Sequence, residues 1–349
     1  MSFLRSTVYG LMSSFAVLGV PIGAKGTVPH EELSNSTTKI KIYLPDHARG
    51  FYRGTRFDWS GMIAELRSQG HTYFSQWFSR SDPSIHDFSS KDSEIIAGPC
   101  TAAVGPVEEF TAPLGYDEAK AGETFVKIGV GILRKPDDAK YDSLRLYDVV
   151  DSGNWQAVKK GNGIEFSQKI IDSSSGYGYS YQKTVMLKHD RPVIVIEHKL
   201  MNIGKHLIQT DVYDHNFLTI DNQSPGPNFT ITLPFEIAPV HPPEKDLAEL
   251  RRNQIVYLKT LTGQDRVYAT MRGFSDSSKD YNIHIENIRT GAGVTITGDH
   301  ALKNLALWSI RSVLAVEPFI EVSVEPGQTY TWTYEYAFRS LGTAQEKQQ

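Results

Sequence analysis

The sequence predicts an all-β protein, built as one large sandwich or barrel. Short segments that alternate apolar and polar residues recur along the chain, and most of them end at Gly, Asp, Asn or Pro. This period-two pattern between turn residues is typical of half-buried strands. The clearest such segments are residues 39–44, 124–133, 164–171, 177–187, 192–202, 228–233, 266–271, 281–288, 294–297 and 329–338. Helical patterns are confined to residues 247–253 and 299–303, so one large β-structure is favoured over a mixed fold.

Composition excludes several functional classes. The 349 residues are 40% hydrophobic and 22% charged, as in ordinary folded proteins. The net charge is −4 and no basic block occurs, which argues against nucleic acid as a partner. The single cysteine, Cys100, excludes an intrachain disulfide and cysteine-based metal or redox sites. The 11 histidines form no metal-binding motif, so we expect neither a metal nor another cofactor.

The first residues have the layout of a secretory signal peptide. Arg5 precedes an apolar run, residues 8–24, which ends in small residues before Lys25. The run is too short and too interrupted by Ser, Gly and Pro for a membrane span, and a short apolar helix or strand is the alternative. We therefore expect a secreted or periplasmic protein without a membrane segment after cleavage, and a cytoplasmic one if the peptide is retained. The expected organisation is a signal peptide (1–24), a flexible lead-in (25–38), a single β-domain (39–340) and a polar tail (341–349).

Two strand-like segments, residues 195–221 and 314–338, carry a histidine and a carboxylate. Val212, Leu218 and Ile220 share one parity of the first segment, whereas His215 and Phe217 share the other. In the second segment Glu317 has the parity opposite to that of its apolar neighbours. Because side chains alternate across a strand, His215 and Glu317 should stand over a second face, away from the packed core. A face with His, Glu and aromatic residues suits sugar binding and acid–base chemistry.

Further candidates for substrate binding come from three other places. The segment 50–61, GFYRGTRFDWSG, contains Arg53 and Arg56, whose guanidinium groups can form paired hydrogen bonds with hydroxyls or a carboxylate. In the same segment Asp58 can orient hydroxyls and Trp59 can stack on a sugar, although a turn with an internal Arg–Asp58 pair is an equal alternative. Other expected contacts are Phe217, Arg311 and Lys127, although a lysine on a strand is more often solvated than bound to a ligand.

The motifs around this pair resemble a known superfamily. Leu200-Met201-Asn202-Ile203-Gly204 leads to His215-Asn216-Phe217, and Glu317-Pro318 leads to the turn Pro326-Gly327-Gln328 and a final strand. In this order and spacing the chain resembles the aldose 1-epimerase, or galactose mutarotase-like, superfamily. The resemblance spans most of residues 40–338, and its two later motifs are the specific ones. It implies a β-supersandwich of large antiparallel sheets with the ligand on a concave face.

The resemblance also implies a mechanism. Glu317 would take the proton of the anomeric hydroxyl and His215 would protonate the ring oxygen, after which the ring opens, the aldehyde carbon rotates and the ring recloses. Arg56 and Asp58 would orient hydroxyls. The chain departs from the family pattern because it has no earlier His-Gly motif, so that Lys127 or His71 would have to replace a second histidine. The resemblance therefore implies a divergent member.

Two alternative functions remain open on the same fold. A carbohydrate lyase would use a base to remove a ring C–H proton, with Arg53, Arg56 or Lys127 neutralising the developing negative charge. A non-catalytic carbohydrate-binding protein would keep the aromatic face without the acid–base chemistry. In each case the expected partner is a monosaccharide or oligosaccharide.

Overall fold

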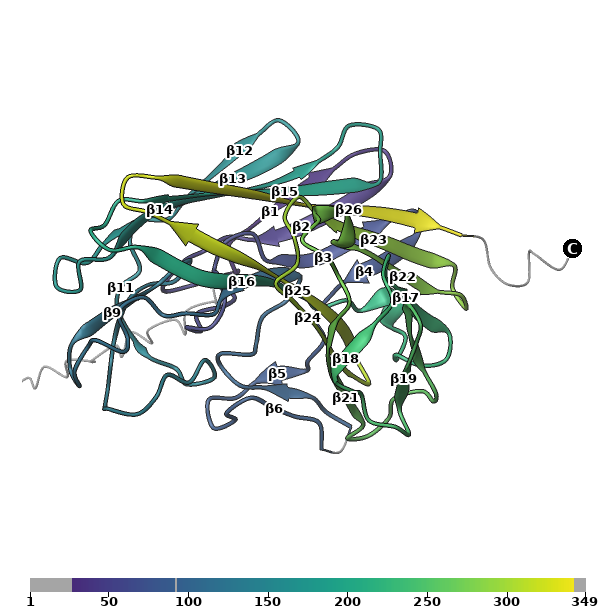
Figure 1. Cartoon of the computed structure of the whole chain (residues 1–349). Coiled ribbons are helices and arrows are strands. Elements are labelled where there is room, and N and C mark those ends of the chain that lie inside the picture. Colours follow the sequence, from purple (N-terminus) through teal and green to yellow (C-terminus); the bar gives the residue numbers. More distant parts are fainter. Residues whose placement is uncertain (1–26, 92, 342–349) are drawn as a thin grey trace, which may run out of the picture.

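The computed structural model describes residues 27–91 and 93–341, which fold into two large antiparallel sheets packed face to face (Figure 1). The larger sheet has ten strands in the order β12-β13-β14-β15-β26-β23-β22-β17-β20-β19. Its strands are β12 (Gln156–Lys160), β13 (Gly163–Ile171), β14 (Gly178–Leu187), β15 (Val193–Asn202), β17 (Phe229–Thr232), β19 (Ala248–Arg251), β20 (Gln254–Tyr257), β22 (Asn282–Asn287), β23 (Ala292–Gly298) and β26 (Thr329–Ser340).

The facing layer combines a six-stranded sheet, in the order β18-β21-β24-β25-β16-β8, with a four-stranded one, β1-β2-β3-β4. Isolated bridges from Leu218 to Phe74 and to Leu314 join the two. The six strands are β8 (Pro106–Phe110), β16 (Ile208–Asn216), β18 (Ala238–His241), β21 (Arg266–Arg272), β24 (Asn304–Ile310) and β25 (Val313–Val324). The four strands are β1 (His30–Ser34), β2 (Thr38–Tyr43), β3 (Ile63–Ser68) and β4 (His71–Phe74).

Loops and two small sheets cover the outer side of the six-stranded sheet (Figure 1). The small sheets consist of β5 (Arg80–Ser81), β6 (Phe88–Ser89) and β7 (Ile96–Ala97), and of β9 (Thr124–Lys127), β10 (Gly131–Arg134) and β11 (Asp148–Asp151). Two short 3-10 helices are η1 (Ile220–Asn222) and η2 (Ser278–Asp280). The prediction of an all-β fold of large antiparallel sheets is confirmed.

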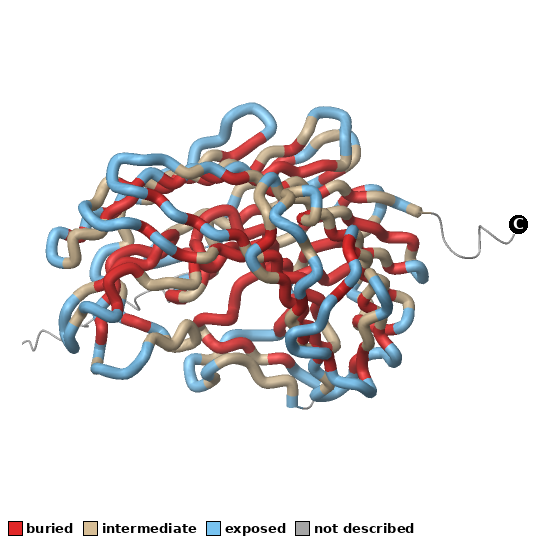
Figure 2. The backbone as a smooth tube through the Cα atoms, in the orientation of Figure 1, coloured by how far each residue is buried: buried red, intermediate tan, exposed pale blue. Residues whose placement is uncertain are grey.

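The middle of the six-stranded sheet, formed by β16, β24 and β25, is largely buried on both faces (Figure 2) and two hydrophobic cores meet there, whereas the edge strand β18 is exposed. Val212 and Val316 belong to the core between the two large sheets. Tyr213 and Phe217 belong to a second, largely aromatic core under the covering loops. The alternation along β16 and β25 is therefore an alternation between two buried environments, because the loops keep solvent from most of the outer face.

Several local predictions differ from the structure. Part of the expected lead-in forms β1, paired with β2. The helix expected at 247–253 is instead a hairpin of β19 and β20, whose turn uses Arg252 at φ 54°, and residues 299–303 contain no helix. The expected signal peptide lies outside the described residues. No helix in the described part of the chain is long and apolar enough to cross a membrane.

Candidate functional site

His215 and Glu317 lie together in a cavity of about 370 Å³ on the outer face of the six-stranded sheet. Its lining residues are Arg56, Asp87, Thr101, Glu109, Ser143, Leu144, Tyr213, His215, Phe217, Arg266, Tyr268, Trp308, Glu317 and Phe319. The structure thus brings together four of the sequence-predicted residues: the two catalytic candidates, Arg56 and Phe217. A larger hollow, of about 500 Å³, lies between residues 115–124 and Tyr177 and does not contain this pair.

The register of β16 against β25 places the histidine opposite the carboxylate. Tyr213 pairs with Phe319, and farther along Leu218 bridges Leu314, which keeps the same register. His215 lies two residues after Tyr213, and Glu317 lies two residues before Phe319. In this antiparallel register His215 therefore faces Glu317 across the two strands. Directly opposed side chains in an antiparallel pair have β-carbons about 4.5–5.5 Å apart. The resulting contact joins His215 Nε2 to Glu317 Oε1 at 3.2 Å.

Aromatic rings fix the orientation of the His215 imidazole. It stacks on Phe217 with ring centres 3.8 Å apart, and Phe57 and Trp308 meet it edge-on at 5.6 and 5.7 Å. Its Nδ1 is buried and has no hydrogen-bond partner among the described residues. Burial, followed by the positive charge of Arg56, lowers the pKa of His215 well below its ordinary value. The imidazole is therefore neutral at neutral pH.

Glu317 is shifted in the opposite direction for the same main reason. Burial raises its pKa from 4.5 to about 7, with Glu109 adding to the rise and the guanidinium groups of Arg56 and Arg266 opposing it. Below pH 7 the pair therefore shares one titratable proton, and the uncharged form, imidazole with carboxylic acid, is favoured over the ion pair. A proton donor and a proton acceptor stand side by side in one cavity.

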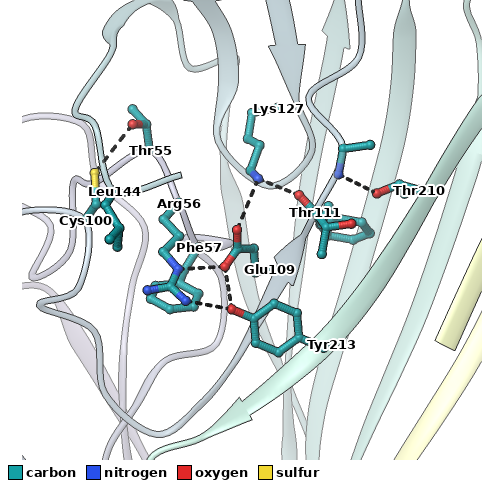
Figure 3. A network of polar contacts seen from close by, with 12 residues as sticks. Thr55, Arg56, Phe57, Cys100, Glu109, Thr111, Lys127, Leu144, Thr210 and Tyr213 are labelled. Carbon is teal, nitrogen blue, oxygen red and sulfur yellow. Dashed lines mark hydrogen bonds and ion pairs between the residues drawn. The ribbon is translucent and has the colours of Figure 1, made fainter. Parts of the chain in front are cut away.

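Glu109 organises a network of buried charges beside this pair (Figure 3). Its Oε2 accepts from Arg56 Nε at 2.6 Å and from the Tyr213 hydroxyl at 2.5 Å, and a second Arg56 nitrogen donates to the same hydroxyl at 2.8 Å. Burial alone would raise the pKa of Glu109, but the charges of Arg56 and Lys127 hold the pKa below its ordinary value. Arg56 is thereby fixed against one wall of the cavity, stacked over Phe57 at 4.5 Å.

Lys127 supports the network from behind and does not line the cavity. Its ammonium lies 3.8 Å from Glu109 Oε1 and donates to the Phe110 carbonyl at 2.5 Å. The side chain is fully buried, and burial lowers the pKa of Lys127 to about 8 against the opposing charge of Glu109. The residue therefore reaches a substrate only through Glu109, and it does not replace a histidine of the cavity.

The remaining candidates lie away from the cavity. Arg53 is exposed and donates to the Ala48 carbonyl at 3.2 Å, while the buried Trp59 donates from its indole nitrogen to the Gly54 carbonyl at 2.8 Å. Arg311 binds the carbonyls of Ser90 and Glu94 at the lip of another hollow.

Asp58 and His71 also serve other parts of the fold. Asp58 is fully buried, accepts from Ser60 and Tyr181, and lies 3.5 Å from the Lys183 ammonium. His71 contacts Asp221 at 2.9 Å. Asp58 is therefore part of an internal ion network, and within residues 27–91 and 93–341 no second histidine lines the cavity.

Sequence reasoning missed Glu109, Arg266, Trp308 and the role of Tyr213. Tyr213 shares the parity of His215, which was a usable signal. No sequence signal pointed to Glu109, because all five residues of β8 are buried and the pattern of alternation is lost. Its neighbour Glu108 contacts Lys183, whereas Glu109 contacts Arg56. Arg266 and Trp308 sit on strands whose order in the sheet the alternating pattern does not reveal.

Comparison with known proteins identifies the fold. No family model matches the chain, and no curated protein matches it in sequence. Among solved structures, a galactose mutarotase related enzyme from Lactobacillus acidophilus is 12% identical, with a TM-score of 0.50 and coverage of 90% of this chain and 98% of that one. An aldose epimerase homologue from C. elegans is 11% identical, with a TM-score of 0.50 and coverage of 90% and 100%. The chain has the galactose mutarotase-like fold. A galactose mutarotase-like protein from Lactobacillus casei, 12% identical with a TM-score of 0.50, has the same fold. At these identities the likeness extends to the fold alone.

Proposed function

We propose that the protein is an aldose 1-epimerase, which interconverts the anomers of a sugar by opening and reclosing its ring. The observation that carries the proposal is the 3.2 Å contact between His215 and Glu317 inside a cavity that contains aromatic rings and a fixed guanidinium. Ring opening requires one group that accepts the proton of the anomeric hydroxyl and another that donates a proton to the ring oxygen. The pair provides both functions with a single proton.

The direction of the first proton transfer follows from the electrostatics of the cavity. The resemblance implies Glu317 as the base and His215 as the acid. Burial favours the uncharged pair, so that Glu317 donates and the neutral imidazole accepts without prior separation of charge. When the open aldehyde rotates and recloses, the proton transfers run backwards and the two roles exchange. Both assignments have the same number of protons and give the same products.

The other residues of the cavity bind and orient the sugar. Arg56 is held by Glu109 and Tyr213, so its guanidinium can donate to a hydroxyl without a further loss of side-chain freedom. Trp308 and Phe319 give apolar surface for the C–H faces of the ring. The proposal therefore needs neither the distant Asp58 nor Trp59.

Polarimetry of freshly dissolved α-D-glucose and α-D-galactose tests the proposal. The wild-type protein should accelerate the approach to the equilibrium rotation, and both H215N and E317Q should lose the acceleration. E321Q is the matched control, because Glu321 is on the same strand but is exposed at the surface beside Lys303.

The alternatives give different results in the same experiment. Acceleration that persists in E317Q would contradict the proposed role of the pair. An ultraviolet-absorbing unsaturated product from a uronate polymer would favour the lyase. Sugar binding without any acceleration, and without an effect of either substitution, would favour a carbohydrate-binding protein.

A further inference from the structure

Charged groups of both signs surround the cavity that holds His215 and Glu317: three cations, Arg56, Arg266 and the supporting Lys127, and the carboxylates of Asp87 and Glu109. Glu109 is shared between two cations, Arg56 at 2.6 Å and Lys127 at 3.8 Å, which leaves one positive charge in excess. Asp87, the third carboxyl group of the lining besides Glu109 and Glu317, accepts from the Thr101 hydroxyl at 2.9 Å and keeps its negative charge. When Glu317 is protonated, the three cations exceed the two remaining carboxylates by one charge, and an excess of fixed positive charge attracts anions.

Arg266 adds a further positive charge at the rim of the cavity. It is the first residue of β21, it is exposed, and it lines the cavity together with Tyr268, two residues farther along the same strand. Its guanidinium carbon lies 5.8 Å from the centre of the Phe88 ring. Among residues 27–91 and 93–341, no carboxylate forms an ion pair with it, whereas Arg56 is bound to Glu109. Its hydrogen-bond donors are therefore available to a ligand.

We propose that the substrate is a sugar that carries a carboxylate, a hexuronate, and that Arg266 binds this carboxylate while the ring lies over His215 and Glu317. This inference rests on the proposed epimerase function and adds the class of substrate. The planar guanidinium fork matches the geometry of a carboxylate and forms paired, charge-assisted hydrogen bonds with it. The cavity volume of about 370 Å³ is in the range of sites that hold small molecules.

The number of free charges favours a carboxylate over a phosphate. A phosphate monoester carries between one and a half and two negative charges at neutral pH, about twice the charge of a carboxylate. The rim offers one guanidinium without a partner, and Arg56 is already held by Glu109 and Tyr213. One free guanidinium balances one carboxylate.

Saturation-transfer NMR between the two anomeric proton signals tests the inference. It measures anomer exchange at equilibrium, so D-glucuronate, D-galacturonate, D-glucose, D-galactose and glucose 6-phosphate can be compared under one set of conditions. The variants are R266Q and the matched control R272Q, each measured at its own pH optimum. Arg272 is on the same strand, is exposed and lies 5.5 Å from the Phe274 ring, but it does not line the cavity.

We expect the wild-type protein and R272Q to exchange the hexuronates faster than the neutral sugars. R266Q should lower kcat/KM for the hexuronates roughly 10- to 100-fold more than for the neutral sugars, which is the range for one lost hydrogen bond to a charged group. Addition of salt should reduce the preference for hexuronates in the wild-type protein, because Arg266 is exposed to solvent.

Other outcomes separate this inference from the proposed function. Three outcomes would overturn the hexuronate assignment without contradicting the epimerase function. They are exchange of the neutral sugars that is as fast as or faster than that of the hexuronates, equal losses for both classes of sugar in R266Q, and a preference for glucose 6-phosphate. If no sugar is exchanged, the epimerase fails, and calorimetric titration with D-glucuronate tests Arg266 separately. Binding that R266Q weakens and R272Q does not would support the carboxylate site, and binding unaffected by R266Q would overturn it.

Discussion

Replacement of Glu317 by glutamine should stabilise the protein at alkaline pH while it removes the activity. Burial raises the pKa of this carboxyl group from 4.5 to about 7. A group whose pKa is raised on folding stabilises the protein fully below its unfolded pKa, and this stability is lost as the pH rises through the folded pKa. Glutamine has nearly the same shape and no charge, so it avoids the cost of a buried carboxylate.

The magnitude follows from the size of the pKa shift. One pKa unit corresponds to about 1.4 kcal/mol, so that above pH 7 the ionised carboxylate costs the wild-type protein about 3 kcal/mol relative to its protonated form. Below pH 4.5 this difference disappears, because the carboxyl group is protonated in both the folded and the unfolded protein. The stability gain of E317Q over the wild-type protein should therefore grow between acidic and alkaline pH.

Denaturant unfolding followed by circular dichroism measures this gain. Wild type, E317Q and E321Q are compared at a pH below 4.5, at pH 7 and at a pH above 8. The exposed Glu321 lies 3.4 Å from Lys303, and removal of such a surface pair changes stability by about 0–1 kcal/mol. A difference between E317Q and the wild-type protein that does not change with pH would refute the reasoning, since it would mean that the folded protein leaves the pKa of Glu317 unshifted.

Three other predictions follow from the same structure. E109Q should lower the free energy of unfolding by about 3–5 kcal/mol, because it leaves Arg56 and Lys127 buried without their shared carboxylate, and thermal unfolding unchanged from wild type would contradict this. The pH profile of kcat/KM should be bell-shaped and should fall above a pH of about 7, where Glu317 loses its proton; a rate that keeps rising through this range would argue against the one-proton pair. K183M should lower the free energy of unfolding by about 3–5 kcal/mol, because Glu108 and Asp58 lose a buried cation. It should leave the pH profile of kcat/KM unchanged, because this ion network lies between the sheets and outside the cavity. A shifted pH profile would show that the network is coupled to the cavity.

Strand alternation made the shared face of His215 and Glu317 predictable from the sequence, whereas other residues of the cavity were not predictable. His215 and Glu317 have the parity opposite to that of the core residues, and this assigned both to one face. Their direct opposition depends on the register of β16 against β25, which is set by pairings more than a hundred residues apart in the chain. Composition and periodicity contain no information on such a register.

The segment 50–61 shows why charged residues in a loop are hard to assign. Arg56 reaches the cavity because Glu109 and Tyr213 hold it there, and both partners come from distant strands. Asp58 turns inward to Lys183, and Arg53 remains at the surface. A loop has no fixed periodicity, so no pattern in the sequence distinguished these three residues. The hairpin of β19 and β20 was mistaken for a helix because local propensity is a weak guide when tertiary pairing decides the conformation.

We propose that His215 and Glu317 act chemically on a bound sugar and do not only line its cavity. Saturation-transfer NMR at a sugar concentration that saturates the site tests this most directly, with binding measured in the same samples from ligand line broadening. We expect E317Q still to bind the sugar, because Arg56 and the aromatic rings remain in place, but the exchange of anomers should fall to the rate of the uncatalysed reaction in solution. Exchange in E317Q at the wild-type rate, with the sugar bound, would contradict the account.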